Sequence, residues 1–269
     1  MKVRFWGVRG SIAVSGSSFV KTGGNTSCVE VEEEGHRLIL DGGTGLRALG
    51  AEIGFQPIEA TLLFSHVHWD HIQGVPFFTP AFHPGSKLTV AGAGESVREA
   101  LSSQMKPPTF PVSLDAMSAD IRYLELKNDQ PFESGPFRIV PFRLDHPNGV
   151  LGFHIQTEHN SLVYATDVEH GERVDPRLIR HSAGADLLIH DAQYTPAEYH
   201  GSGGPSRVGW GHSAWTQAIE TALRANVERL ALFHHDPCRT DDGVDSIEDM
   251  ARKCFTNAFA AREGLELAL

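Results

Sequence analysis

Residues 65–71 read Ser-His-Val-His-Trp-Asp-His, and an apolar run over residues 60–64 comes directly before them. A strand that ends in this segment would bring His66, His68, Asp70 and His71 into one small volume. Three imidazoles and a carboxylate at this spacing are typical of metal ligands. An ordinary cluster of surface histidines is the alternative, and the spacing favours the metal site. We therefore interpret the segment as one half of a two-metal site.

The overall charge limits which partners fit the chain. It has 269 residues, 41% of them hydrophobic, which is enough for one large α/β domain or two small ones. Lys and Arg number 23 against 34 Asp and Glu, a formal net charge of −11. Long-range electrostatics would therefore repel a nucleic acid, and no local basic patch offsets this. The charge argues against a large RNA partner.

The cysteines and the N-terminal residues bear on the compartment. Cys28, Cys238 and Cys254 have no paired spacing, which argues against a disulfide framework and fits a reducing compartment. Residues 1–6 alternate polar and apolar side chains and contain no apolar core of a signal peptide. No run is long enough to span a bilayer. The sequence predicts a cytoplasmic protein with no membrane partner.

The first half predicts a β-meander with strands over residues 2–6, 27–33 and 37–40. Glycine-rich loops at 7–11 and 23–27 interrupt it, and tight turns are favoured over phosphate cradles because neither loop has the spacing of a nucleotide motif. Asp41 follows a buried-looking strand, where it either supports a metal-ligating histidine or forms a turn.

The stretch after the histidine cluster predicts mixed structure. Residues 72–84 are rich in proline and aromatic side chains and should border the metal site without a long regular element. A strand over 87–91 and a helix over 94–104 follow. The loop over 105–112 is apolar, which favours a lid or a homodimer contact over an ordinary surface loop.

The second half repeats the plan of the first, with strands over 121–126, 137–142, 150–157 and 161–166. His146 and Asp167 fall at ends of these strands, where a second set of ligands is needed. An α/β alternation follows, with helices over 174–181, 213–225 and 245–261 and strands over 186–190 and 229–234. The last strand ends at His234. Ser213 is a predicted N-cap, which places His212 at the start of a helix.

These residues resemble the metallo-β-lactamase superfamily along essentially the whole chain. The resemblance implies an α/β protein, a four-layer αβ/βα sandwich, formed by residues 1–269 as a single hydrolase domain. It also implies that one metal is held by His66, His68 and His146 and the other by Asp70, His71 and His234, with Asp167 bridging. His234 is preferred over His235 because the family's ligand follows a Leu-x-Leu-x-His strand end.

Four segments resemble the phosphodiesterase branch of this superfamily, which contains tRNase Z and cyclic phosphodiesterases. They are residues 23–27, 68–74, 190–194 and 211–213. His68 stands where the flavodiiron members carry Glu, which favours a hydrolase. In tRNase Z, a Glu pairs with a later His that protonates the leaving oxygen. The matching segments here place Asp191 and His212 in those positions, with Asp191 one methylene shorter than Glu. The implied catalytic residues are His212, Asp191 and the metal ligand Asp70.

The resemblance thus implies a hydrolase with two divalent metal ions, zinc first and manganese or iron as alternatives. A hydroxide bridging the ions would attack a small cyclic or linear phosphodiester, such as a 3′,5′-cyclic nucleotide. The alternatives are a tRNase Z-like RNA endonuclease and a non-catalytic metal-binding sensor of the same fold. A lactonase or thioesterase is a weaker enzymatic alternative.

Overall fold

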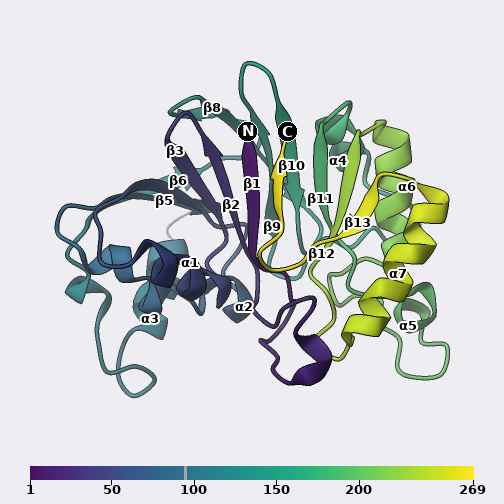
Figure 1. The fold of residues 1–269 in the computed structure, drawn as a ribbon, viewed down its shortest axis with the longest axis horizontal. Helices are drawn as coiled ribbons and strands as arrows, with labels where there is room; N and C mark the ends of the chain where they lie inside the picture. The colour runs from purple at the N-terminus through teal and green to yellow at the C-terminus, as the bar shows by residue number, and fades with distance from the viewer. Residues whose placement is uncertain (94–95) are drawn as a thin grey trace.

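The computed structural model describes residues 1–93 and 96–269, and two seven-stranded sheets form its centre. The sheets pack face to face, and helices cover the outer face of each (Figure 1). Buried side chains gather in three layers, one between the sheets and one beneath each set of helices. This arrangement confirms the predicted α/β class and the four-layer αβ/βα sandwich.

The first sheet has the order β14-β1-β2-β3-β4-β5-β6. Its antiparallel part, β14 to β3, contains the hairpin between β2 and β3, in which Glu34 and Gly35 adopt positive φ. From β3 to β6 the strands are parallel. The bounds are β1 (Lys2–Gly7), β2 (Cys28–Glu33), β3 (His36–Leu40), β4 (Glu59–Leu63), β5 (Lys87–Ala93), β6 (Asp120–Leu126) and β14 (Glu266–Ala268).

The second sheet has the order β13-β12-β11-β10-β9-β8-β7. It too joins an antiparallel part, β7 to β10, to a parallel part, β10 to β13. The bounds are β7 (Phe132–Ser134), β8 (Phe137–Leu144), β9 (Val150–Gln156), β10 (Ser161–Ala165), β11 (Leu187–Asp191), β12 (Arg229–Phe233) and β13 (Ala258–Ala260).

The longer helices cover the outer faces of the sheets because they present apolar sides to them. Leu46 and Leu49 of α1 are buried in the layer beneath the first sheet, and Ala218 and Ala222 of α6 in the layer beneath the second. The bounds are α1 (Gly45–Ile53), α2 (Trp69–Ile72), α3 (Ser96–Gln104), α4 (Pro176–Ser182), α5 (Pro196–His200), α6 (Trp215–Ala225) and α7 (Asp241–Cys254).

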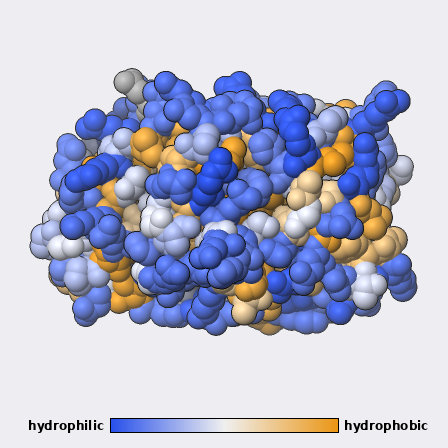
Figure 2. All heavy atoms as spheres, turned by 90° about the horizontal axis from the view of Figure 1, so that it is seen from above, coloured by the Kyte–Doolittle hydropathy of each residue, from blue (hydrophilic) through white to orange (hydrophobic). Residues whose placement is uncertain are grey.

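The carboxyl ends of β4, β10, β11 and β12 meet at one edge of the sandwich, the lower edge in Figure 1. Parallel neighbours must end at the same edge, and the loops that follow them therefore converge. Both termini lie at the other edge, which is largely hydrophilic (Figure 2). Within residues 1–93 and 96–269, no helix is long and apolar enough to cross a bilayer.

Two helix predictions were wrong in their bounds. The last helix was predicted over 245–261, but α7 ends at Cys254 and residues 258–260 form β13 beside β12. Its start is earlier because Thr240 caps the helix by accepting from the amide of Gly243. Ser213 is not the N-cap of α6, which begins at Trp215 after Ala214. The Ser213 hydroxyl instead donates to the carbonyl of Val168.

The remaining local predictions have mixed outcomes. Residues 94–95 of the predicted helix over 94–104 lie outside the described residues, and α3 begins at Ser96. The short elements β7, α5, β13 and β14 were not predicted. In the apolar loop over 105–112, Met105 is buried, and the ring of Phe110 packs edge-on against Phe77 with 5.8 Å between centroids. The loop is therefore partly docked on the α1–α3 side, and its role as a lid or dimer contact stays a prediction.

Candidate metal centre

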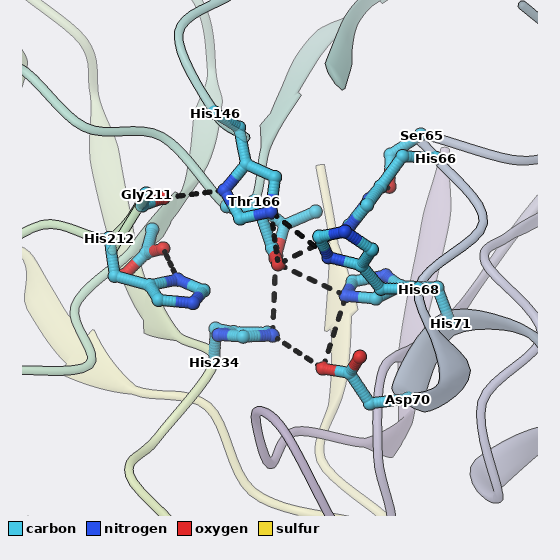
Figure 3. Close-up of polar contacts among 12 residues, drawn as sticks. Ser65, His66, His68, Asp70, His71, His146, Thr166, Gly211, His212 and His234 are labelled. Carbon is cyan, nitrogen blue, oxygen red and sulfur yellow. Dashed lines mark hydrogen bonds and ion pairs between the residues drawn. The ribbon is translucent and has the colours of Figure 1, made fainter. Parts of the chain in front are cut away.

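The candidate ligands come from four strand ends at the loop edge of the sandwich. The 66–71 segment follows β4, His146 lies between β8 and β9, Asp167 follows β10, and His234 follows β12. Their side chains converge on one small space (Figure 3). His66, Asp70, His71, Asp167 and His234 are buried, whereas His68 and His146 are partly exposed.

Three acidic or histidine residues at these strand ends adopt a left-handed backbone conformation. The φ angles are 59° at Asp41, 51° at Asp167 and 59° at His234. Such values cost a non-glycine residue about 1–3 kcal/mol and are concentrated at functional sites. The turn at each strand end directs these side chains into the converging space.

The ligand atoms fall into two groups that share one carboxylate. In one group they belong to His66, His68, His146 and Asp167, and in the other to Asp70, His71, Asp167 and His234. Within each group these atoms lie within 4.8 Å of one another. The structure thus brings together all seven residues that the resemblance implies as ligands, in the implied grouping.

Four of the histidines each donate a hydrogen bond from Nδ1 to a neighbour outside the cluster. The acceptors are the Asp41 carboxylate for His71 (2.8 Å), the Gly211 carbonyl for His146 (2.8 Å), the Gln193 amide oxygen for His234 (2.9 Å) and the Ser65 hydroxyl for His66 (3.1 Å). When the ring is neutral, the proton on Nδ1 leaves Nε2 with a free lone pair. In metal sites, a hydrogen bond from the nitrogen that does not bind the metal fixes the tautomer of the histidine in the same way.

The inward ring nitrogens test whether the cluster fits metal ions. Nε2 of His66 and Nε2 of His71 are buried and have no hydrogen-bond partner among the described residues. They lie 3.5 and 3.3 Å from Oδ2 of Asp167 without hydrogen-bond geometry. Buried polar atoms are nearly always paired. Two unpaired nitrogens that face a shared carboxylate are explained by divalent cations between them, so the residues fit the implied ions.

The protonation of the histidines agrees with this fit. Burial lowers the pKa of His66, His68 and His146, and neutral imidazole is the form that binds metals. Burial also acts to lower the pKa of His71, but the carboxylates of Asp167, Asp70 and Asp41 outweigh it and raise that pKa well above its ordinary value. A local excess of carboxylate charge at His71 is what a bound cation would neutralise.

Asp41 supports the cluster from behind. Besides the bond from His71, its carboxylate accepts from the Ser65 amide (2.8 Å), the Ser65 hydroxyl and the Tyr164 hydroxyl (2.8 Å). Of the two sequence interpretations of Asp41, the structure thus matches the supporting one. Tyr164 was missed, because nothing in the sequence connects a tyrosine of β10 to an aspartate after β3.

His212 and Asp191 lie beside the cluster. Oδ2 of Asp191 accepts from Nδ1 of His212 at 2.8 Å, so the shorter carboxylate does reach the ring. Asp191 is fully buried, and its Oδ1 accepts from the amides of Gln193 (3.0 Å) and Ser213 (3.3 Å). Burial acts to lower the pKa of His212, but the charge of Asp191 raises it to about 9. The imidazolium form is therefore stabilised at neutral pH.

The ring of His212 has a defined place relative to the ligands. It stacks on His234 with 4.9 Å between centroids and meets His146 edge-on at 5.3 Å. Figure 3 shows it on the side of the cluster opposite Ser65 and His66. Ligand atoms of Asp167, Asp191, His212 and His234 also lie within 4.8 Å of one another. His212 is thus close enough to act on a group bound at the cluster.

A pair of buried histidines behind Asp191 was also missed. The Asp175 amide donates to Nδ1 of His170 (3.1 Å), and Nδ1 of His190 donates to the Asp191 carbonyl (2.7 Å). The proton between the two rings must then sit on Nε2 of His170, which donates to Nε2 of His190 at 3.0 Å. Burial lowers the pKa of both rings, so the pair is neutral. This series of hydrogen bonds, from the Asp175 amide through both rings to the Asp191 carbonyl, holds the backbone of Asp191 in place.

Glu169 holds the loop that precedes His212. Its carboxylate accepts from the amides of Gly209 and Gly211 and from the Tyr199 hydroxyl, each at 2.7 Å. Gly211 has a φ of +87°, and a Cβ there would lie 2.2 Å from Nδ1 of His146. Glycine is therefore required where this loop passes the ligand. Glu169 follows Asp167 by two positions, a proximity that could have drawn attention to it.

The glycine-rich loops of the N-terminal part pack tightly. A Cβ on Gly10 would lie 2.4 Å from the ring of His234, and one on Gly7 would lie 1.8 Å from the Thr26 carbonyl. The two loops also bond to each other, because the Asn25 carbonyl accepts from the amides of Val8 and Arg9, both at 2.9 Å. These contacts agree with the predicted tight turns. In addition, the Ser11 amide donates to Asp70 at 2.7 Å, which ties the first loop to the cluster.

Comparisons with known proteins agree with the fold. Residues 36–235 match the family described as the Beta-lactamase superfamily domain, and the chain belongs to this superfamily. A protein named Ribonuclease Z from Gemmatimonas aurantiaca is 25% identical over 297 aligned positions, which cover 90% of each chain.

Solved structures show the same fold. The metallo-beta-lactamase fold protein YhfI from Bacillus subtilis superposes with a TM-score of 0.75 at 20% identity over 99% of both chains. A structure described as a new diphosphatase from the PhnP family superposes with a TM-score of 0.74 at 16% identity, over 100% of this chain and 97% of that one. These structures show that the chain has the metallo-β-lactamase fold. Together with the family match and the Ribonuclease Z relatives, the fold makes the protein a metal-dependent hydrolase.

Proposed function

We propose that this hydrolase cleaves phosphodiesters with two divalent metal ions held in the cluster. The observation that carries the proposal is the His212–Asp191 pair beside the shared carboxylate of Asp167. Alkoxide groups leave phosphorus poorly, so their cleavage needs a proton donor at the leaving oxygen. A buried imidazolium held by a carboxylate, next to a cluster that fits two cations, is suited to that task.

The residues of the site have two proposed roles, holding the metal ions and donating a proton to the leaving oxygen. His66, His68 and His146 would hold one ion, Asp70, His71 and His234 the other, and Asp167 would contact both. Ions bound there supply an activated water and neutralise the charge that develops on the phosphoryl oxygens. Asp191 keeps the Nδ1 proton of His212 in place, so the proton on Nε2 is the one that His212 donates to the leaving oxygen.

Two substrate classes fit the proposed reaction, RNA and small phosphodiesters. The curated relatives are named Ribonuclease Z, which favours RNA as the substrate. The sequence predicted a small phosphodiester first and RNA as the alternative. Two observations favour the small diester. The alignment with the Gemmatimonas aurantiaca protein runs over 297 positions and takes in about 242 residues of this chain, so about 55 positions of that protein have no counterpart here. The net charge of −11 also opposes a large polyanion.

Zinc is the proposed metal, because histidine-rich sites with carboxylates suit it, with manganese and iron as alternatives that metal analysis separates. The reducing cytoplasm is the proposed location, since Cys28, Cys238 and Cys254 are all free thiols. A single hydrolase domain over residues 1–269 and a homodimer contact through the loop over 105–112 are also proposals.

A substrate panel tests the proposed function. The purified chain, with its metal content measured, is assayed on 3′,5′-cyclic nucleotides, 2′,3′-cyclic phosphates, dinucleotides and pre-tRNA, and on lactones and thioesters as controls. We expect phosphodiester hydrolysis that a chelator abolishes and added metal restores. Cleavage of lactones or thioesters in preference to every diester would contradict the proposal. Bound metal without any turnover would instead support a sensor.

A further inference from the structure

A cavity of about 310 Å³ adjoins the metal centre on the side away from His212. Its lining includes Ser65, His66 and His68 from the loop after β4. Figure 3 shows Ser65 and His66 across the cluster from His212. If His212 protonates the leaving oxygen, the group that stays on the phosphate has to lie elsewhere around the cluster. The cavity is a place for that retained group.

The two walls of the cavity also carry ligands of the metal centre. One wall contains His66 and His68, and the other continues from the turn that holds His146. The amide of Leu151 donates to the carbonyl of Ser65 at 2.9 Å, which ties the walls together. A group seated in the cavity is therefore placed relative to the ligands by rigid strand ends and not by a free loop.

The chemistry of the lining indicates the kind of group. Apolar side chains from both walls form much of the surface: Val67, Ala93, Val97, Val150 and Leu151. Besides Ser65, His66 and His68, the polar side chains of Asn148 and Arg143 line it. Arg143 is exposed, and its guanidinium makes no hydrogen bond or ion pair that joins it to another described residue. An apolar pocket with a few polar groups is typical of a small-ligand site.

Nucleobases match this lining. They have apolar faces and hydrogen-bonding edges, and Asn and Arg are the side chains that most often read those edges. The volume is at the low end for a ligand pocket, so it suits one nucleoside and not an oligonucleotide. We propose that this cavity is a nucleoside subsite, in which Asn148 and Arg143 bind the base of the nucleoside retained on the phosphate. This inference rests on the proposed function, which assigns the leaving group to His212.

Paired substrates with one leaving group test the subsite. Thymidine 5′-(p-nitrophenyl phosphate) and methyl p-nitrophenyl phosphate both release p-nitrophenolate, and they differ only in the retained group. With the metal-loaded chain we expect kcat/KM to be at least about tenfold higher for the thymidine ester. Arg143→Ala and Asn148→Gly should each lower the ratio of the two values about tenfold. Glycine is the replacement at Asn148 because φ there is 67°.

Arg138→Ala is the matched control, since Arg138 is an exposed arginine of the same strand, β8, outside the cavity lining. It changes the net charge equally and should leave the ratio unaltered. Equal losses on both esters in Arg143→Ala, or the same change in Arg138→Ala, would overturn the subsite.

Ligand binding separates the subsite from the proposed function. The metal-loaded chain is titrated calorimetrically with adenosine, guanosine, cytidine and uridine 5′-monophosphates and with inorganic phosphate. At least one nucleotide should bind about tenfold more tightly than phosphate and lose that advantage in Arg143→Ala. If neither ester is hydrolysed but this pattern holds, the proposed reaction fails and the subsite stands. If every nucleotide binds no better than phosphate, the subsite is wrong whatever the enzyme hydrolyses.

Discussion

Four rings in the cluster have an outward nitrogen, Nδ1, and an inward one, Nε2, and this division determines what a single substitution removes. The Nδ1 atoms of His66, His71, His146 and His234 are bonded to neighbours, whereas their Nε2 atoms face the shared space. His212 uses Nδ1 in the same way toward Asp191, but Asp191 is an acceptor outside both ligand groups of the proposal. Substitutions of His212 should therefore affect proton transfer more than metal content.

We expect His212→Ala to lower hydrolysis of a 3′,5′-cyclic nucleotide by about 10²–10⁴-fold, because an alkoxide leaving group needs the proton. Hydrolysis of a p-nitrophenyl diester should fall much less, since p-nitrophenolate leaves unaided. Steady-state rates on both substrates measure the difference. His200→Ala, an exposed histidine in α5, is the control and should change neither rate. Equal losses on the two substrates would remove His212 from the role of acid.

Asp41 contacts His71 and Ser65 and lies outside the shared space. Asp41→Asn should weaken metal affinity about 10–100-fold, the usual effect of losing the partner that orients a ligating histidine. A chelator competition assay measures it. Tyr164→Phe removes a single bond to the same carboxylate and should weaken affinity less. Unchanged affinity in Asp41→Asn would show that His71 is held by packing alone.

At the residue scale, the sequence predicted the site residues that are marked by local spacing or by a strand end. It missed those that are defined by contacts between distant segments. His66, His68, Asp70 and His71 were recognisable because they are close in the chain, and His146, Asp167 and His234 because each ends a strand. Tyr164, Glu169 and His170 were missed. Their partners Asp41, Gly211 and His190 are set by how the two sheets and their loops pack, which spacing along the chain does not reveal.

Among the elements, β9 and α4 contain a pair of histidines that should make stability depend on pH. His154 of β9 faces His181 of α4, with 6.5 Å between ring centroids. Burial, followed by the charges of His181 and Arg138, lowers the pKa of His154 to about 4. An unfolded histidine has a pKa of about 6.5. Between these two values the unfolded chain binds more protons than the folded one, so stability falls as pH drops from 6.5 to 4.

His154→Gln should reduce the loss of stability between pH 6.5 and pH 4 by about 1–2 kcal/mol, a value discounted for the partial exposure of the ring. Urea unfolding at several pH values measures it. His159→Gln is the control, because His159 is exposed. A pH profile that His154→Gln leaves unchanged would show that this ring is not a source of acid sensitivity.

At the element scale, periodicity predicted the long strands and helices well but not their ends. The C-terminal helix was overextended because residues 255–261 contain good helix formers, yet residues 258–260 pair with β12 as β13. Pairing with a neighbouring strand outweighs local propensity there. The short elements β7 and β14 were missed for a related reason, since three residues are too few for a periodic pattern.

For the whole molecule, charge and length bear on the substrate together. A net charge of −11 and the absence of about 55 aligned positions relative to a Ribonuclease Z favour a compact diester, while the names of the relatives favour RNA. The whole fold places one deep polar cluster at a single edge and leaves the opposite edge largely hydrophilic (Figure 2). In the proposed mechanism, both substrate classes need the same two ions at that edge.

Metal reconstitution is the most direct test of whether diester hydrolysis needs two ions at this cluster. The chain is stripped of metal, and its rate on bis(p-nitrophenyl) phosphate is measured as zinc is added in increments. The proposed cluster holds two ions, one in each ligand group with Asp167 common to both, so the rate should be absent at first and saturate at two equivalents per chain. Activity in the stripped protein, saturation at one equivalent, or no diester hydrolysis at any metal content would contradict the account.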